Sequence, residues 1–467
     1  MTQALGLCAS SFTAFFVYLV VALQVCFASS QLGCNEGLDT SENVKKLRYF
    51  MEFQGANLSH LCVKESPSGG RGLFANRFIS SSEPIFSVPE DVIMDPLQPR
   101  PTDIKDILSW RSPAPLFDSL MFFILACRRL ERCSNHWRPL FESLPEPSEV
   151  HLPIMWSSTE RMLLKGTNAF LSLERDDVTI SNVSKMINAA LRSSRLPEAS
   201  IDEVRYTHAI VVSRAFDLKF PGRQNITRVL IPFVDLLNHR PDIHILYEFE
   251  KKGSAFGFKV STNTSFAPNA EVFVNYGNTN SSSSSMFLQY GMSSPATASD
   301  SFQIMPSIAR DELFDLKQEA LRAAGIDVQV PDGDLSISLS GDVPPKLLRC
   351  IAVLTSNKTH STRLKQIASG KFLPKSLEEA SLKSLSHGIR GVLEGFTSDF
   401  DTDDRVHPYR LSLARHQVQL EKSILTRCAF VPLDPEGLFS RLFFYSCFPA
   451  FSYPCSQRPA KNQEAAA

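Results

Sequence analysis

Three short segments, far apart in the chain, carry residue types that could do chemistry. The first is the run GGRGLF at 69–74, whose consecutive glycines let backbone N–H and C=O groups approach a ligand closely because no Cβ intervenes. The second, PFVDLLNH at 232–239, places an amide and an imidazole directly after an apolar strand. The third, VFVNYG at 272–277, ends a strand with a tyrosine and a glycine. The first run lacks the Gly-Lys-Ser/Thr ending of a P-loop, so a phosphate-binding loop is not expected.

Each segment also has an ordinary structural interpretation when it is taken alone. Glycine turns between strands are common, and His239 could be a hydrogen-bonded structural histidine. Asp235 could be a solvated or capping residue, and Tyr276 could simply pack in a core or a turn. A functional interpretation therefore depends on the three segments being read jointly.

The composition is that of a globular protein and excludes two broad classes. The chain has 467 residues, of which 43% are hydrophobic and 21% charged. A chain of this length suits about two or three domains. The 48 Lys and Arg residues balance the 49 Asp and Glu residues, so bulk charge excludes a polybasic nucleic-acid binder. The apolar content excludes wholesale disorder.

The first 30 residues form an apolar leader. Residues 12–28 are a nearly continuous apolar run of 17 residues. As a helix this run is roughly 25 Å long, slightly short of a bilayer core. Small residues at 28–30 suit cleavage, so we expect 1–30 to be a signal peptide. An uncleaved signal anchor and an error in the predicted gene are the alternatives, since no basic residues precede the run.

The leader also sets the expected location. It indicates entry into the secretory pathway or the first half of an address to a complex plastid. If it does not function, the cytosol or the nucleus is expected. Membrane contact is expected only through this segment, if it is uncleaved.

The ten cysteines do not form a recognisable metal motif. No Cys-x-x-Cys occurs, so a zinc knuckle is not expected. Cys127 and Cys133 lie in or beside a helical run rich in Leu and Phe, which favours buried thiols.

Hydrophobic spacing predicts a helical block between two sets of short strands. Helices are expected at 45–53, 115–132, from Ser157 onward, 200–216, 311–324, 377–396 and 409–428, with capping boxes at Ser157/Glu160 and Ser200/Glu203. Short strands are expected within 67–89, where they would form a small antiparallel sheet, and at 229–232, 256–260 and 271–277. The serine run 281–285 is expected to be a flexible loop tip, and the aromatic segment 438–451 is expected to dock on the core.

In their order along the chain, these motifs resemble the SET-domain protein methyltransferases, in the branch that includes the Rubisco large-subunit lysine methyltransferase. The motifs are GRGL at 70–73, SRAF at 213–216, DLLNH at 235–239 and NYG at 275–277. WRPLF at 137–141, SLP at 143–145, Trp156 and LKGT at 164–167 resemble the helical insertion of that branch. The C-terminal third resembles its substrate-binding helical domain.

The resemblance implies an α+β fold with a β-rich SET core. The SET domain would span 45–294, with a helical insertion at about 105–225. A mainly α-helical substrate-binding-like domain would span 300–455, and 456–467 would be a tail.

The resemblance also implies S-adenosylmethionine-dependent methylation of a lysine side chain. The partner would be a protein substrate gripped by the C-terminal helical domain, and a monomer is expected. Neither structural zinc nor direct nucleic-acid binding is expected. Methylation of a histidine and a non-catalytic SET-like binding module are the alternatives.

By position in the motifs, the resemblance assigns a role to each site residue. Tyr276 would be the catalytic tyrosine, and Tyr247 and Tyr290 would line the pocket of the target lysine. Asp235 would fix its loop. The residues implied to bind the cofactor are Gly70, Arg71, Gly72, Ser213, Arg214, Asn238 and His239. Arg214 would pair with the cofactor's carboxylate and Asn238 would anchor its amino-acid end.

The sequence departs from the family pattern at three places. Gly69 occupies a position that is often acidic, and Met292 a position that is often Phe. The serine run replaces the usual turn after Tyr276. These departures leave room for altered specificity or weakened activity.

Overall fold

The computed structural model describes residues 41–67, 69–100, 116–252, 255–276, 281–328, 333–397, 400 and 406–429. The leader, the segment 438–451 and the tail lie outside these described residues, so the expectations for them stay predictions. Among the described helices, none combines the length and the apolar character that crossing a membrane requires. The chain divides into two compact units: residues up to Phe302 together with Gly391–Ser423, and Gln303–Arg390 together with residues from Ile424 onward.

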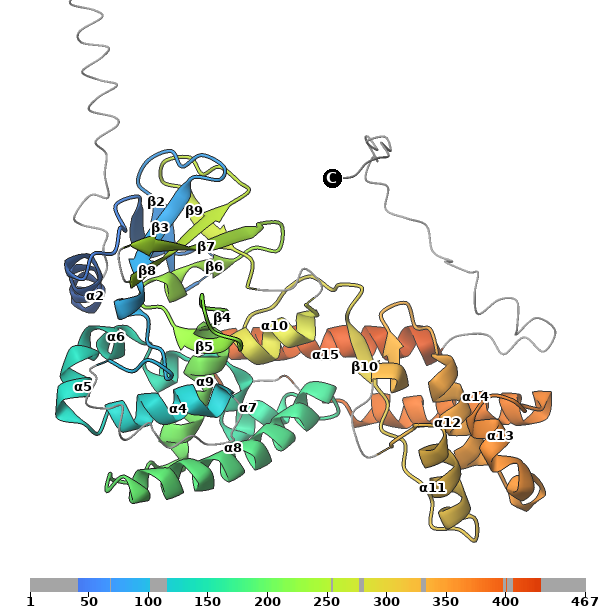
Figure 1. The fold of residues 1–467 in the computed structure, drawn as a ribbon. Helices are drawn as coiled ribbons and strands as arrows, with labels where there is room; N and C mark the ends of the chain where they lie inside the picture. The colour runs from blue at the N-terminus through green and yellow to red at the C-terminus, as the bar shows by residue number, and fades with distance from the viewer. Residues whose placement is uncertain are drawn as a thin grey trace, which may run out of the picture. The chain divides into compact units, whose positions relative to one another are not determined.

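The described strands up to residue 274 form two small sheets and a hairpin. One sheet has the order β1-β2-β9-β6 and the other has the order β3-β8-β7, while β4 pairs with β5. Their bounds are β1 Leu61–Glu65, β2 Arg71–Ala75, β3 Pro84–Pro89, β4 Ala215–Leu218, β5 Thr227–Leu230, β6 Asn238–His239, β7 Ile245–Lys252, β8 Ala255–Thr262 and β9 Glu271–Val274. In Figure 1 the strands of the two sheets gather in one β-rich region.

The strands expected within 67–89 are present as β2 and β3, but the prediction that they share one sheet is wrong. β2 pairs with β1 and β9, whereas β3 pairs with β8. Local sequence predicts a strand from its alternation and turns, but it does not name the distant strand that will complete the ladder.

The helical insertion follows β3 and gathers beside the β4–β5 hairpin (Figure 1), where α4 packs on β5 and α9 on β4. The described α-helices of the first unit that precede Phe302 are α2 Glu42–Phe53, α4 Leu116–Cys127, α5 Glu131–His136, α6 Arg138–Ser143, α7 Ser158–Met162, α8 Asn168–Ser193, α9 Ile201–Arg214 and α10 Ser283–Tyr290. Ser157 and Ser200 form the predicted capping boxes and begin α7 and α9.

Two local predictions are wrong, one about where a helix ends and one about where a helix begins. The helix from Ser200 was predicted to reach Phe216, but it ends at Arg214 because Phe216 pairs with Val229 in the hairpin. The serine run is a helix start, not a loop tip. The hydroxyl of Ser282 accepts a hydrogen bond from the backbone N–H of Ser285 at 3.1 Å and caps α10.

Cys127 and Cys133 are buried, as predicted, but they are not free thiols. They form a disulfide across a sequence separation of 6, with Cα atoms 5.1 Å apart. This bond joins the end of α4 to α5. Cys350 and Cys428, both buried, are free cysteines.

The core of the first unit is a single cluster of buried apolar side chains from the sheets and the helical insertion. Phe86, Phe233 and Phe287 are among the largest fully buried side chains. Trp137 is also fully buried, and its indole N–H donates a hydrogen bond to the Arg100 carbonyl oxygen at 2.8 Å. The sheets and the insertion therefore share one core, which holds the strand ends in fixed positions.

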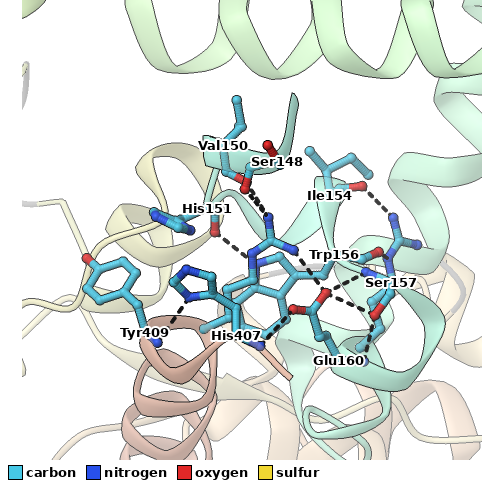
Figure 2. Close-up of polar contacts among 11 residues, drawn as sticks. Ser148, Val150, His151, Ile154, Trp156, Ser157, Glu160, His407 and Tyr409 are labelled. Atoms are coloured by element: carbon cyan, nitrogen blue, oxygen red, sulfur yellow. Dashed lines mark hydrogen bonds and ion pairs between the residues drawn. The ribbon is translucent and has the colours of Figure 1, made fainter. Parts of the chain in front are cut away.

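The last helix of the described chain, α15 (Pro408–Ala429), is fixed to the helical insertion by buried charges. Arg410 forms an ion pair with Glu160 at 2.9 Å and also donates to the Val150 carbonyl oxygen at 3.0 Å (Figure 2). The rings of His151 and His407 lie beside this pair, with centroids 4.8 Å apart. Residues of α15 up to Ser423 therefore belong to the first unit.

The second unit is mainly helical, as predicted. Its elements are α11 Phe314–Ala323, β11 Ser336–Ser338, α12 Pro345–Thr355, α13 Leu364–Ala368 and α14 Lys375–Gly395 up to Arg390; β10 Ser301–Gln303 ends at its boundary. α11, α12 and α13 pack against one another around buried Leu321, Leu347 and Ile367. α11 stops just before Gly325, whose φ of 66° suits a helix end.

Candidate active site

The segments 232–239 and 271–276 meet through a short parallel strand pair. β6 and β9 place Asn238 opposite Phe273 and His239 opposite Val274. The turn before β6 includes Phe233, whose φ of 71° lies in the left-handed region that few non-glycine residues adopt. Phe233 is fully buried, and we infer that the packing of its ring holds this backbone conformation.

Tyr276 follows β9 and is fixed to the neighbouring segment by two hydrogen bonds. Its backbone N–H donates to Nδ1 of His239 at 3.1 Å, and its phenol donates to the Leu237 carbonyl oxygen at 2.7 Å. The rings of His239 and Tyr276 have centroids 5.3 Å apart. Burial lowers the pKa of His239 below its usual value, which favours the neutral ring that an accepting Nδ1 requires.

The glycine-rich run joins the same sheet through β2. β2 is antiparallel to β9, with Phe74 opposite Glu271. The side-chain amide of Asn238 donates to the Arg71 carbonyl oxygen at 3.2 Å and to the Glu271 carboxylate at 2.7 Å. A Cβ on Gly72 would collide with the Glu271 carboxylate and the Asn238 amide, so a larger residue here would have to displace both side chains. The structure thus brings the three segments together.

The glycine at 69, where the family is often acidic, has a backbone reason. Gly69 has a φ of 96° and Gly70 a φ of 71°, conformations that an L side chain adopts only with strain. Apart from the chain neighbours, no atom of the described residues lies within 4 Å of the place where a Cβ would stand at either residue. The turn is therefore glycine because of its backbone and not because of crowding.

A cavity of about 1050 Å³ opens beside these segments. The predicted site residues that line it are Ser213, Arg214, Tyr247, Tyr276 and Tyr290. The predicted cofactor residues Gly70, Arg71, Gly72, Asn238 and His239 are not in its lining. Of these, His239 is connected to the cavity wall through its hydrogen bond with the backbone N–H of Tyr276.

Tyrosine side chains form one wall of the cavity. The rings of Tyr276 and Tyr290 have centroids 4.7 Å apart. Burial raises the pKa of both phenols above the ordinary tyrosine value, so both stay protonated at neutral pH. Tyr247 of β7 is 52% exposed and packs against Phe258 with ring centroids 5.9 Å apart, which places it toward the solvent side.

Arg214, at the end of α9, already has an acidic partner. It forms an ion pair with Asp235 at 2.9 Å, which is consistent with the expectation that Asp235 fixes its loop. The other carboxylate oxygen of Asp235 is buried without a hydrogen-bond partner. The Arg71 side chain leaves the sheet and donates to the Ser143 carbonyl oxygen at 2.8 Å. Burial and the nearby charge of Arg214 lower the pKa of Arg71.

Sequence reasoning missed several polar residues of the cavity wall. Arg228 and Asp217, opposite each other in the β4–β5 hairpin, form a two-bond ion pair at 2.7 and 2.6 Å and line the cavity. His208 also lines it, and burial lowers its pKa to about 4. The hairpin register would have revealed the ion pair, whereas a single histidine on a helix gives no distinguishing signal. Among the described residues, no group of three or more His, Cys, Asp or Glu side chains is arranged to hold a metal ion.

Residues 309–425 match the family described as Rubisco LSMT substrate-binding. A Nicotiana tabacum protein, the ribulose-1,5 bisphosphate carboxylase/oxygenase large subunit N-methyltransferase of the chloroplast, is 22% identical over 356 residues, which is 72% of this chain and 70% of that protein. The chloroplast [fructose-bisphosphate aldolase]-lysine N-methyltransferase of Arabidopsis thaliana is 24% identical over 394 residues, 78% of this chain and 77% of that protein.

Solved structures share the fold. The SET domain of LSMT bound to methyl-lysine and AdoHcy aligns with a TM-score of 0.67 at 20% identity, covering 83% of this chain and 91% of that one. Rubisco LSMT bound to AdoMet aligns with a TM-score of 0.64 at 21% identity over the same shares. The predicted α+β architecture is confirmed. Its ordered motifs, its matching C-terminal region and this shared fold make the chain similar to the SET-domain protein methyltransferases of the Rubisco large-subunit methyltransferase-like branch.

Proposed function

We propose that this chain is a protein-lysine methyltransferase that uses S-adenosylmethionine to methylate a lysine side chain of a protein substrate. The observation that carries the proposal is the tyrosine-lined cavity, in which the protonated phenol of Tyr276 lies beside Tyr290 and is held by the Leu237 carbonyl. The relatives from Nicotiana tabacum and Arabidopsis thaliana are named as N-methyltransferases, the second of them of lysine.

The residues present fit S-adenosylmethionine. No described residue donates a hydrogen bond to Oδ1 of Asn238, so this atom can accept one from an ammonium group. Among the described residues, only Nη1 of Arg214 has a hydrogen-bond partner, which leaves its other N–H groups for a carboxylate. When bound, S-adenosylmethionine supplies an electrophilic methyl group on a sulfonium sulfur, which is a good leaving group.

The remaining cofactor contacts would come mainly from the backbone. The run that contains Gly70, Arg71 and Gly72 would offer its N–H and C=O groups, for which the open space beside Gly70 leaves room. His239 would contact the adenine through its main chain, because its ring is engaged with Tyr276. Ser213 would add a contact next to Arg214.

The chain's own task is to deliver a neutral amine in line with the methyl group. Lysine has an ordinary pKa of about 10.4, so only about one amine in a thousand is neutral at pH 7. Removal from water inside the cavity disfavours the ammonium form, while the charges of Arg214 and Arg228 on its wall are offset by their partners Asp235 and Asp217. The faces of Tyr247 and Tyr290 would steer the arriving cation toward the cavity.

The second unit would hold the protein substrate. Residues 309–425, which match the substrate-binding family, include all of α11, α12 and α13.

We propose that the protein works as a monomer, which size-exclusion chromatography with light scattering would test. The leader would direct it into the secretory pathway or toward a complex plastid, and a fluorescent reporter fused after residue 39 would test this.

Two measurements test the proposed function. Calorimetry with the purified protein should show binding of S-adenosylmethionine, and Asn238→Ala should weaken it. When the purified protein is incubated with an extract of cells that lack the gene, it should methylate a protein of that extract. Mass spectrometry should locate the methyl group on lysine. A methyl group on histidine, or cofactor binding without any transfer, would reject the proposal in favour of the corresponding alternative.

A further inference from the structure

Glu271 holds a position between two of the site segments that the motifs alone did not assign. It is the first residue of β9, and its carboxylate accepts a hydrogen bond from Nδ2 of Asn238 at 2.7 Å. The same nitrogen donates its other proton to the Arg71 carbonyl oxygen at 3.2 Å. Both protons of the Asn238 amide are therefore used inside the protein.

These contacts allow only one orientation of the amide. If the amide were rotated by half a turn, its oxygen would face the Glu271 carboxylate and the Arg71 carbonyl, which are both acceptors. Two hydrogen bonds would be lost and three oxygens would lie together. In the observed orientation, no described residue donates to Oδ1, and this oxygen is not among the buried atoms that lack a partner. Oδ1 therefore keeps its capacity to accept a hydrogen bond from a ligand.

Glu271 is itself fixed on both sides. Its second carboxylate oxygen accepts a hydrogen bond from the Ser66 hydroxyl at 3.0 Å, in the turn that leads to the glycine run. Its first oxygen occupies the space where a Cβ of Gly72 would stand. The antiparallel pairing of β2 with β9 fixes the position of Glu271 relative to this turn. The carboxylate is thus a rigid acceptor and not a mobile surface group.

We propose that Glu271 is a positioning residue for cofactor recognition. By holding Nδ2 of Asn238, it presents Oδ1 as an acceptor for the ammonium group at the amino-acid end of S-adenosylmethionine. The proposal rests on the proposed function, because it deepens the role of Asn238 in that site. It predicts that the selectivity of the site for the ammonium group depends on Glu271 through Asn238.

The test compares two ligands by calorimetry, S-adenosylhomocysteine and its analogue in which hydrogen replaces the α-amino group. The wild-type protein should bind the first at least about tenfold more tightly, because the analogue lacks a charged donor. Glu271→Ala should reduce this preference to roughly threefold or less, by weakening only the amino-bearing ligand. Glu271→Gln should retain most of the preference, because its side-chain oxygen can still accept from Nδ2.

A double-mutant cycle shows whether the effect passes through Asn238. Asn238→Ala should abolish the preference, and adding Glu271→Ala to it should change nothing further. Glu248→Ala, at an exposed position of β7, is the matched control and should keep the wild-type preference. If Glu271→Ala does not fold, Ser66→Ala, which removes one of the two hydrogen bonds to the carboxylate, should give a partial loss.

Two results would overturn the inference while the proposed function stands. One is an unchanged preference in Glu271→Ala or, where that variant does not fold, in Ser66→Ala. The other is an equal loss in Glu271→Ala and Glu271→Gln, which would mean that the charge acts directly on the ligand and not through the amide. If the wild-type protein binds neither ligand, the proposed function fails and the inference fails with it.

Discussion

The phenol of Tyr276 donates a hydrogen bond to the main-chain carbonyl oxygen of Leu237, at 2.7 Å. Leu237 immediately precedes Asn238, so the proposed catalytic tyrosine and the proposed cofactor anchor are tied to one strand end. The ring of Tyr276 is fixed further by Tyr290, 4.7 Å away between centroids. The hydroxyl of Tyr276 is therefore one of the contacts that fix its ring in the cavity wall.

Tyr276→Phe removes this hydroxyl and should reduce methyl transfer far more than cofactor binding. Loss of the hydroxyl that fixes the ring should lower kcat by roughly 100-fold, because alignment of amine and methyl donor limits the reaction. The affinity for S-adenosylhomocysteine should stay within about threefold of wild type, since Asn238 and Arg214 remain. A kcat equal to that of wild type would remove Tyr276 from the catalytic machinery. Phe258→Leu, a change behind Tyr247, is a suitable control for nonspecific loosening.

The pH profile follows from the protonation state of the same residue. Because burial raises the pKa of Tyr276, the phenol is protonated throughout the assay range and cannot serve as the base. The rate should then rise with pH from about 7 to about 9 as the lysine substrate loses its proton. Tyr276→Phe should show the same rise at a lower level. A break in the wild-type profile that disappears in Tyr276→Phe would instead show that Tyr276 titrates.

Local features of the fold could be predicted from the sequence, whereas contacts between distant segments could not. The capping boxes at Ser157 and Ser200 were predictable because cap and acceptor lie within one helical turn. The proximity of the glycine run to Asn238 was predictable only through the family resemblance, since β2 finds its partner β9 far along the chain. No local pattern indicated that Arg214 would pair with Asp235, or that Glu271 would hold the Asn238 amide. Partner choice there is made by tertiary packing.

For Cys127 and Cys133, burial could be predicted from the sequence but the disulfide could not. Their burial could be predicted from the apolar run around them, but the disulfide depends on a turn that brings their Cα atoms to 5.1 Å. A separation of 6 residues in a helical run would otherwise place the two side chains on different faces of the helix.

Glu421 should make the stability of the protein depend on pH in an unusual direction. This carboxyl is fully buried in α15, where it accepts hydrogen bonds from the backbone N–H of Asn168 and from Gln417, and burial raises its pKa to about 7. The folded state then binds a proton more tightly than the unfolded state, whose glutamate has a pKa near 4.5. The contribution of Glu421 is therefore complete below that value and is lost as pH rises toward 7.

Glu421→Gln isolates this contribution because glutamine cannot ionise. The difference in unfolding free energy between wild type and Glu421→Gln should fall by on the order of 3 kcal/mol between about pH 4.5 and about pH 7.5. Urea unfolding at several pH values would measure it. A difference that does not change with pH would mean that the carboxyl has the same pKa in both states.

The buried pair of Glu160 and Arg410 should be the most sensitive point in the attachment of α15 (Figure 2). Burial opposes ionisation of Glu160, but hydrogen bonds from Ser157 and the charge of Arg410 outweigh it and hold its pKa below the ordinary value. Arg410→Ala leaves this carboxylate buried without its partner and should cost about 3–5 kcal/mol of unfolding free energy.

Replacing the unpaired carboxylate with a neutral amide separates the cost of the buried charge from the cost of the lost packing. Arg410→Ala combined with Glu160→Gln should regain part of the loss, because glutamine can keep the capping box with Ser157. Lys46→Ala breaks an exposed pair with Glu142 and should cost less than about 1 kcal/mol. Equal losses in Arg410→Ala and Lys46→Ala, measured by urea unfolding, would show that the buried pair does not hold α15. In that case the double variant would regain no unfolding free energy, because Arg410→Ala would not have left an unpaired buried charge.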